Sequence, residues 1–271
     1  MPELPEVETI ARGLANAITG RTIADAEVSL GRVVVPEPQR FGAEIAGERV
    51  ERVGRRGKYV VATLGSGRAL VVHLRMTGRL IFQAAGAWTP CPYTNVALRF
   101  VDGSRLCFAD ARTFGRMRLV GPEEPWAAEV GVEPLSEEFS LECFSGLLDR
   151  RTTPIKAFLL DQRRIAGIGN IYACEALWEA RIRPSRPAGA LSQPSRARLH
   201  GAIGSVLSRA IEHRGTSVDD YVDAEGLRGG FQNQLSCYGR DGKACPRCGN
   251  TIVRTVLAQR GTWWCRTCQK R

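Results

Sequence analysis

The chain has 271 residues, a hydrophobic content of 44% and a formal net charge of +10. This length exceeds the usual size of a single folded core, so it predicts a globular protein with more than one domain. No apolar run is long enough to cross a bilayer, and the start MPELPEVE is acidic, unlike an export signal. These features argue against a membrane protein and predict a cytoplasmic one.

The chain begins with a pattern typical of a helix followed by short strands. Apolar residues recur at helical spacing from Leu4 to Ile18, and Pro5 and Glu6 suit a first turn. Turn residues, with no helical segment, separate six β-rich stretches: 59–64, 69–74, 79–82, 96–101, 105–109 and 116–120. This pattern favours a mainly antiparallel sandwich, and we assign residues 1–121 to this N-terminal domain.

The sequence pattern changes after residue 121 from β-rich segments to a linker and then to helical segments. Scattered prolines among acidic residues predict a linker, and four segments then carry apolar residues at helix spacing: 139–148, 155–162, 171–180 and 195–213. A glycine-rich stretch at 215–231 follows the last helix, and we expect it to act as a lid. We assign residues 122–235 to the linker and a helical domain that includes this stretch.

Residues 236–271 have the cysteine spacing of a zinc module. Cys245, Cys248, Cys265 and Cys268 form a C-x2-C-x16-C-x2-C array, which suits one tetrahedral Zn²⁺. A segment this short has too little core to fold unaided, so the metal is expected to stabilise it. The remaining cysteines are odd in number, which argues against a disulfide framework: Cys91, Cys107, Cys143, Cys174 and Cys237.

The same C-terminal segment is strongly basic. Residues 240–271 contain eight arginines or lysines and one aspartate. Clustered guanidinium groups attract polyanions, although charge alone gives binding without sequence preference. The segment therefore predicts a nucleic-acid partner.

The N-terminus offers a nucleophile. Met1 before the small Pro2 is readily removed, which leaves a secondary amine whose pKa is about 8, so part of it is neutral at physiological pH. Glu3 or Glu6 is available to carry a proton. The alternative interpretation is that these residues merely begin a helix.

Eight motifs, in the same order along the chain, match a known family. They are PELPEVET from residue 2, GRRGKY at 54–59, HLRMTG at 73–78, DARTFGR at 110–116, GIGNIYACEAL at 167–177, GGFQ at 229–232, YGRDGKACPRCG at 238–249 and QRGTWWCRTCQ at 259–269. The chain resembles bacterial formamidopyrimidine-DNA glycosylases, which are bifunctional base-excision repair enzymes. The resemblance implies an α+β multidomain protein with a β-sandwich, a helix–two-turns–helix module and a zinc finger that clamps DNA.

The resemblance also implies the catalytic residues. Pro2 would attack the anomeric carbon of the damaged nucleotide and form a Schiff base, while Glu3 would donate and accept protons. The resulting iminium acidifies the adjacent sugar carbon, so β- and δ-elimination can follow. Lys58 matches a family lysine that assists proton transfer and holds a phosphate; without the motif it reads as a surface lysine. Arg260 matches the zinc-finger arginine.

DNA contacts are implied in the same way. A base inside a duplex must be flipped out before it can react, and Met76, Arg112 and Phe114 match the residues that fill the gap. Without the resemblance, Met76 and Phe114 would be interpreted as core residues. Asn170 matches a phosphate contact, with a plain helix cap as the alternative.

Five further DNA contacts are assigned mainly because of the resemblance, and the residue types alone support them less. His73, Arg151 and Lys156 match family DNA contacts, although a histidine at a strand end is as often structural. Tyr93 stands where a histidine is frequent and can still donate to phosphate. Glu6 is assigned to the same DNA-binding set.

Three alternatives remain open at this point. A sister group, endonuclease VIII, shares the chemistry but favours oxidised pyrimidines; its N-terminus usually reads PEGPE, whereas Leu4 here favours oxidised purines. A non-catalytic protein that binds damaged DNA and a zinc-ribbon RNA-binding protein are the others. We expect a monomer that acts on double-stranded DNA containing oxidised bases or abasic sites.

Overall fold

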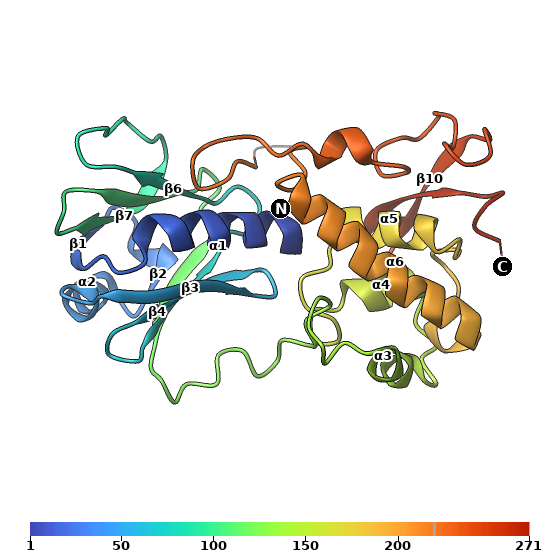
Figure 1. Cartoon of the computed structure of the whole chain (residues 1–271), viewed down its shortest axis with the longest axis horizontal. Helices are drawn as coiled ribbons and strands as arrows, with labels where there is room; N and C mark the ends of the chain where they lie inside the picture. The colour runs from blue at the N-terminus through green and yellow to red at the C-terminus, as the bar shows by residue number, and fades with distance from the viewer. Residues whose placement is uncertain (219–220, 271) are drawn as a thin grey trace. The chain divides into compact units, whose positions relative to one another are not determined.

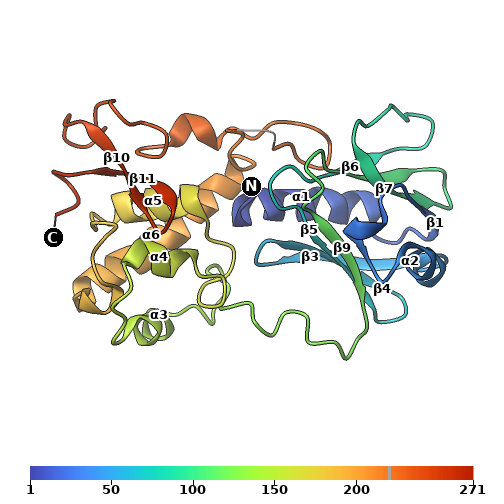
Figure 2. The ribbon, with the colours of Figure 1, turned by 180° about the vertical axis from the view of Figure 1, so that it is seen from behind.

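The computed structural model describes residues 1–218 and 221–270. These residues form two compact units, which we describe separately (Figures 1 and 2). The first unit comprises residues 1–128 and 213–232, and the second comprises residues 129–212 together with the described chain from residue 233 onwards. Among the described residues, no helix combines the length and the apolar character needed to span a bilayer.

The first unit contains two sheets. The four-stranded sheet has the order β1 (Ile23–Val28), β7 (Thr94–Phe100), β8 (Arg105–Ala109), β6 (Arg79–Gln83), and all of its pairs are antiparallel. The five-stranded sheet has the order β2 (Val34–Val35), β9 (Arg116–Val120), β5 (Ala69–His73), β4 (Tyr59–Leu64), β3 (Val50–Arg56). Its β2–β9 pair is parallel and its other pairs are antiparallel. The predicted β-sandwich is confirmed.

Helix α1 (Leu4–Ile18) packs its apolar side against β3, β4 and β6. Val7, Ile10, Leu14 and Ile18 are all buried in a core to which both sheets also contribute. Strand β4 shows the alternation that produces this core, because every second residue of the strand is buried. The predicted amphipathic helix is therefore confirmed, with the predicted bounds.

Four elements of this unit were not predicted from the sequence. They are β1, β2, β3 and α2 (Pro38–Ile45). Strand β3 reads VERVGRR, which has few apolar residues and no clean alternation, so its pairing with β4 determines its structure. Helix α2 has eight residues and buries two of them, Phe41 and Ile45, which is too little for a clear periodic signal.

The second unit is helical and ends in a hairpin. Its helices agree with the predicted segments to within about two residues, the usual uncertainty at helix ends. They are α3 (Leu141–Leu148), α4 (Ile155–Leu160), α5 (Asn170–Glu179) and α6 (Gln193–Glu212), followed by the strands β10 (Ile252–Leu257) and β11 (Arg260–Cys265). Short 3₁₀ turns complete the elements of both units: η1 (Gly31–Val33), η2 (Ala188–Ala190) and η3 (Phe231–Gln234).

The glycine-rich stretch lies in a different unit from the one predicted. The sequence places residues 215–231 in the helical domain, whereas the structure groups residues 213–232 with the sandwich. The reason is a set of long-range contacts that no local pattern reveals. For example, the N–H of Phe82 in β6 donates to the carbonyl of Ala224.

Candidate functional site

The residues at the head of α1 are buried and fixed by a capping box. Glu3 is the N-cap of the helix, and its N–H donates to Oε2 of Glu6 at 2.8 Å. Pro2, Glu3 and Glu6 are all buried. These residues do begin a helix, as the alternative interpretation held. The same cap also holds Pro2 and Glu3 in a defined position within a low-dielectric environment.

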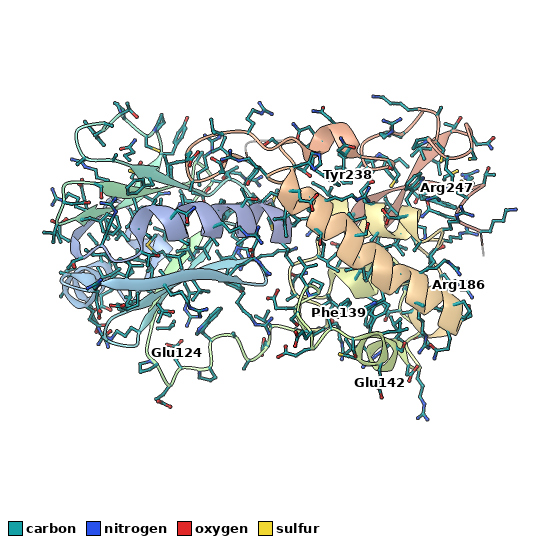
Figure 3. The ribbon with its side chains drawn as sticks, in the orientation of Figure 1. Glu124, Phe139, Glu142, Arg186, Tyr238 and Arg247 are labelled. Carbon is teal, nitrogen blue, oxygen red and sulfur yellow. The ribbon has the colours of Figure 1, made fainter. Side chains whose placement is uncertain are left out.

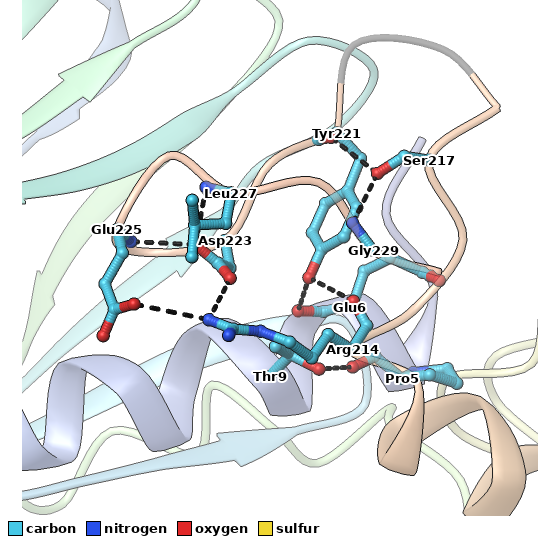
Figure 4. Close-up of polar contacts among 10 residues, drawn as sticks. All are labelled: Pro5, Glu6, Thr9, Arg214, Ser217, Tyr221, Asp223, Glu225, Leu227 and Gly229. Carbon is cyan, nitrogen blue, oxygen red and sulfur yellow. Dashed lines mark hydrogen bonds and ion pairs between the residues drawn. The ribbon is translucent and has the colours of Figure 1, made fainter. Parts of the chain in front are cut away.

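Glu6 also holds the glycine-rich loop (residues 213–231). Its Oε1 accepts the N–H of Thr216 at 2.7 Å. The hydroxyl of Tyr221 lies within hydrogen-bonding distance of the carbonyls of Glu6 and Arg214 (Figure 4). Gly215 has a φ of +80°, and a Cβ there would lie 2.9 Å from the Glu6 side chain. Only glycine therefore allows the loop to approach the helix this closely.

A second carboxylate organises the base of this loop. Asp223 is buried, accepts the N–H groups of Glu225 and Leu227 at 2.9 Å each, and pairs with the guanidinium of Arg214 (Figure 4). Coulombic attraction by Asp223 raises the pKa of Arg214. The predicted lid also includes residues 219 and 220, which lie outside the described residues.

Lys58 lies in the turn of the β3–β4 hairpin, next to Gly57, and is 6% exposed. It is not the surface lysine that its residue type alone suggests. Tyr59 pairs with His73 across β4 and β5, and Nδ1 of His73 accepts the N–H of Arg75 at 2.9 Å. Burial, helped by the charges of Arg75 and Lys58, lowers the pKa of His73 to about 3, so this imidazole is neutral at neutral pH.

The proposed gap-filling residues protrude from the surface of the first unit. Met76 is 38% exposed and Phe114 is 51% exposed, so the interpretation of these two residues as core is wrong. The guanidinium of Arg112 lies 5.0 Å from the centre of the Phe114 ring. Tyr93 is 71% exposed. Large exposed apolar side chains of this kind are a mark of an interaction surface.

One buried carboxylate connects the loops that carry these residues. Asp110 is 1% exposed, and its Oδ2 accepts the N–H of Gly115 at 2.7 Å. Its Oδ1 accepts the hydroxyl of Thr77 and the N–H of Arg112. Its own N–H donates to the carbonyl of Tyr93 at 3.0 Å. The segments that follow β5, precede β7 and precede β9 thus meet at a single residue, the first and last of them through its carboxylate.

The sequence interpretation did not assign Asp110 a role. The available signal was an aspartate at the end of a predicted strand, followed by a short polar turn, because aspartate often accepts from the backbone N–H groups that follow it. Asn95 completes the arrangement, since its Nδ2 donates to the carbonyl of Asp110 at 3.0 Å.

In the second unit, Asn170 faces the zinc-finger hairpin. It is the first residue of α5, whose N-cap is Gly169, so the interpretation of Asn170 as a plain cap is wrong. Its Nδ2 donates to the carbonyl of Gly261 at 3.1 Å, and its buried Oδ1 has no hydrogen-bond partner among the described residues. Lys156 is fully buried and donates to the same carbonyl at 2.9 Å and to the Thr262 hydroxyl at 2.7 Å.

The expected direct DNA contact by Lys156 therefore needs correction. The hairpin covers its ammonium group, which holds β11 in place instead of lying on the surface. The exposed Arg260 begins that strand, directly after a tight turn in which Ala258 and Gln259 both have positive φ. Arg151 is also exposed, and its backbone pairs with Gly189 rather than with the Asn170 region.

The four cysteines of the predicted zinc site come together. The Sγ atoms of Cys245, Cys248, Cys265 and Cys268 all lie within 4.8 Å of one another. Two of the separations are 4.0 Å (Cys245–Cys268) and 3.6 Å (Cys248–Cys265), and tetrahedral Zn–S bonds of about 2.3 Å require about 3.8 Å. The indole N–H of Trp178 donates to Sγ of Cys245. The donors and their spacing fit one structural Zn²⁺.

The structure thus gathers the candidate residues into two groups, one in each unit. The first unit holds Pro2, Glu3, Glu6, Lys58, His73, Met76, Tyr93, Arg112 and Phe114. The second unit holds Arg151, Lys156, Asn170, Arg260 and the four cysteines. The catalytic candidates other than Arg260 therefore share one unit with the gap-filling candidates.

Three family models match the chain in sequence order. They are the formamidopyrimidine-DNA glycosylase N-terminal domain over residues 1–117, the formamidopyrimidine-DNA glycosylase H2TH domain over 130–222, and a zinc finger found in FPG and IleRS over 242–271. Together they cover most of the chain.

Full-length relatives and solved structures agree with these matches. The chain is 47% identical to the formamidopyrimidine-DNA glycosylase of Chloroflexus aggregans, over 99% of this chain and 98% of that one. The crystal structure of MutM (FPG) from Thermus thermophilus is 41% identical, with a TM-score of 0.89 and coverage of 99% and 98%. The Lactococcus lactis Fpg in complex with DNA containing an abasic site is 35% identical, with a TM-score of 0.93 and coverage of 99% and 100%. The chain belongs to the formamidopyrimidine-DNA glycosylase family.

Proposed function

We propose that this protein is a bifunctional DNA glycosylase that removes oxidised purines, including 8-oxoguanine and formamidopyrimidines, and then cleaves the strand at the abasic site. The observation that carries the proposal is the first unit's combination of a capped, buried Pro2–Glu3 pair with the exposed Met76, Arg112 and Phe114. Pro2 and Glu3 can act on a sugar. Met76, Arg112 and Phe114 can fill the gap that a flipped nucleotide leaves in a duplex. The Lactococcus lactis relative has been solved with DNA containing Fapy-dG and with DNA containing an abasic site.

The chemistry begins at the secondary amine that removal of Met1 exposes. The nitrogen of Pro2 forms a bond to the anomeric carbon while the N-glycosidic bond breaks, and the base departs with a proton. Glu3 is close enough along the chain to supply protons to the sugar and to receive the proton that the amine loses. Ring opening gives an iminium between Pro2 and the sugar.

The iminium then accounts for strand cleavage. It withdraws electrons from the neighbouring carbon, so the loss of a proton there expels the 3′ phosphate, and a second elimination expels the 5′ phosphate. Lys58 supports these steps as a cation near a phosphate and as a proton carrier. Lys58 is buried, and a low dielectric strengthens the interaction of its charge with a phosphate. A buried lysine also changes its protonation state more readily when nearby charges change.

The DNA contacts divide between the two units. Met76 and Phe114 enter the base stack and Arg112 pairs with the orphaned base, while Tyr93 donates to the backbone. In its neutral form, with Nδ1 accepting from Arg75, His73 presents Nε2–H as a donor to phosphate.

In the second unit, Asn170, Arg260 and Arg151 contact phosphates. The Nδ2 group of Asn170 has two N–H donors, and the one that does not bind Gly261 can donate to a phosphate oxygen. Lys156 acts as a positioning residue, because it holds the hairpin that carries Arg260.

A second candidate activity is the removal of oxidised pyrimidines. One observation favours it: the Lactococcus lactis Fpg has also been solved with DNA containing an oxidised pyrimidine. We place it behind the purine activity because Leu4 differs from the PEGPE start of the sister group. A non-catalytic protein would have no use for the Pro2 and Glu3 arrangement. The division into domains 1–121, 122–235 and 236–271 is a further part of the proposal, except that the glycine-rich stretch packs with the first unit. A cytoplasmic location and a monomeric state complete it.

A variant of the proton carrier tests the function directly. Glu3→Gln should slow excision of 8-oxoguanine opposite cytosine on the order of 100-fold, because departure of the base and opening of the sugar ring need a positioned proton donor. It should slow cleavage at a preformed abasic site much less, since that sugar is already partly open as an aldehyde. Equal losses on both substrates would show that Glu3 has no separate role in base removal.

A further inference from the structure

We propose that the second unit contains an anion-binding site, separate from the expected DNA contact at Asn170, that takes ligands rich in phosphate. The site is a cavity of about 620 Å³ beside the zinc site, since Cys248 and Cys268 also line it, and no aspartate or glutamate does. Five of them are cationic: Arg181, Arg186, Arg198, Arg247 and Lys270.

These cations come from three parts of the unit. Arg181 and Arg186 belong to the loop after α5, and Arg198 lies in α6. In the zinc finger, Arg247 lies between the first two cysteines and Lys270 follows the last one (Figure 3 labels Arg186 and Arg247). Segments far apart in sequence thus deliver like charges to one cavity. Like charges repel one another, and the thiolates of the zinc site can offset only part of five positive charges, so an anion between these cations is favourable.

Backbone carbonyls hold several of these side chains without neutralising them. Arg247 donates to the carbonyls of Trp178 at 2.9 Å and Glu179 at 3.3 Å, and its guanidinium lies 3.9 Å from the centre of the Trp178 ring. Arg186 donates to the carbonyl of Ala190 at 2.8 Å. A guanidinium has five N–H donors, so each arginine keeps donors for a ligand.

No carboxylate competes for this charge within the described chain. None of the five cations forms a salt bridge to a described residue, whereas many other surface arginines of this protein are paired, such as Arg40 with Glu44 and Arg99 with Asp25. The cavity therefore has the charge and the planar donor groups that match phosphate oxygens.

An adjoining cavity adds another arginine next to this site. This second cavity of about 370 Å³ is lined by Arg183 and shares Arg186 with the first. The Nε of Arg183 is buried and has no hydrogen-bond partner among the described residues. Arg183 therefore adds a further cation beside the first cavity.

The site lies at the opposite end of α5 from Asn170, the expected phosphate contact on this helix. Asn170 is the first residue of this helix and faces Gly261, whereas Arg247 binds the carbonyls at the other end of the helix. Ten residues of helix span about 15 Å, so one phosphate cannot reach both places. Two separate sites on one unit can hold two anionic groups at once.

The size of the cavity favours a compact ligand, since small-molecule sites typically measure about 300–1,000 Å³. Two sources carry the same chemistry: a free polyphosphate such as a nucleoside triphosphate, and the backbone of a second DNA segment. Both offer closely spaced phosphate groups.

The test uses the full-length, zinc-loaded protein saturated with a duplex that contains an abasic-site analogue, so that the first DNA site is occupied. The variant Arg181→Gln/Arg198→Gln removes two exposed cations from the cavity. The control Arg40→Gln/Arg99→Gln removes the same charge from the other unit. Inorganic triphosphate is titrated by calorimetry, and a labelled undamaged second duplex is added in a parallel anisotropy measurement.

We expect the cavity variant to bind at least one of these probes about tenfold more weakly than the wild type and the control do, the loss typical of one charge-assisted contact. A loss for triphosphate identifies a free polyphosphate, and a loss for the second duplex alone identifies DNA. Equal binding by all three proteins, or no binding by the wild type, would overturn the proposal.

Two checks keep this result independent of folding and of the repair activity. Zinc content and the melting temperature are compared for every protein, and Arg181→Gln/Lys270→Gln replaces the first variant if that one does not fold. Cleavage of a lesion duplex should be unchanged in both the cavity variant and the control. A failure of the glycosylase proposal would therefore appear in cleavage and not in these binding measurements.

Discussion

The carboxylate of Glu6 joins the N–H of Thr216 to the helix that begins with the catalytic candidates. Its Oε1 accepts from Thr216 at 2.7 Å, while its Oε2 accepts from Glu3 at 2.8 Å. One side chain therefore fixes both the proposed proton carrier and the glycine-rich loop. The placement of this loop is thus linked directly to the placement of the chemistry.

Glu6→Gln tests this link. A glutamine retains one acceptor oxygen, so either Thr216 or Glu3 loses its partner, and a buried unsatisfied N–H costs about 1–3 kcal/mol. We expect the free energy of unfolding in urea to fall by about this amount, and the excision of 8-oxoguanine to slow.

The matched control is Glu27→Gln, which changes an exposed glutamate of the same unit. If the Glu6 and Glu27 variants were equally stable and equally active, the proposed link between loop and helix would be wrong.

Asp110→Asn tests the side chain that connects the gap-filling loops. An amide N–H₂ cannot accept the N–H of Gly115, so the arrangement of Arg112 and its neighbours should loosen. We expect about tenfold weaker binding of a lesion duplex, measured by anisotropy, together with a lower melting temperature.

Asp102→Asn serves for comparison, because Asp102 holds a turn next to Ser104 between β7 and β8. It should leave DNA affinity unchanged. Wild-type affinity in the Asp110 variant would remove the proposed positioning role.

His73 gives a pH dependence with a defined sign. Its pKa is about 3 in the folded protein and about 6.5 in an unfolded chain, so between these values the unfolded state binds a proton that the folded state does not. The free energy of unfolding should therefore fall as the pH falls from about 6.5, with a slope of at most about 1.4 kcal/mol per pH unit from this group.

The variant His73→Asn keeps an acceptor for the N–H of Arg75 but does not titrate in this range. Stability should be measured for both proteins between pH 7 and pH 4.5, a range chosen to cover about two units below the ordinary histidine pKa. Parallel curves would show that His73 contributes nothing to the slope.

Removal of the metal should unfold the zinc finger and release the DNA. Cys265→Ser, or treatment with a strong chelator, should abolish zinc binding and weaken lesion-duplex binding by about tenfold or more, since a metal site of this type supplies the folding energy of its module. Zinc content is measured together with DNA affinity. Cys143→Ser, which changes a cysteine outside the cluster, should behave as the wild type. Full cleavage by a zinc-free protein would contradict a clamping role for the module.

The sequence predicted those elements whose signal is local. The helical spacing from Leu4 to Ile18 and the paired cysteine spacing each correspond to one continuous physical repeat or motif, and the structure confirms them. Strand β3 was missed because it lacks alternation and depends on β4 for its pairing.

The environments of single side chains could not be predicted, because partners distant in sequence create them. Lys156 is buried by a hairpin 105 residues away, and Glu6 meets Thr216 across 210 residues. The role of Asp110 depends on three segments that meet only in the folded sandwich. Residue type and motif order identified candidates, and tertiary packing decides which of them are exposed to a ligand.

Borohydride trapping tests the central claim most directly, namely that the amine of Pro2 attacks the damaged nucleotide. The protein is incubated with borohydride and a duplex carrying 8-oxoguanine opposite cytosine, with dihydrouracil and undamaged duplexes beside it, and the attached peptide is mapped. We predict a covalent adduct at Pro2 in a chain that lacks Met1, strongest on the 8-oxoguanine duplex. No adduct from zinc-loaded protein that lacks Met1 and still binds the duplex, or an active chain that retains Met1 throughout, would contradict the account.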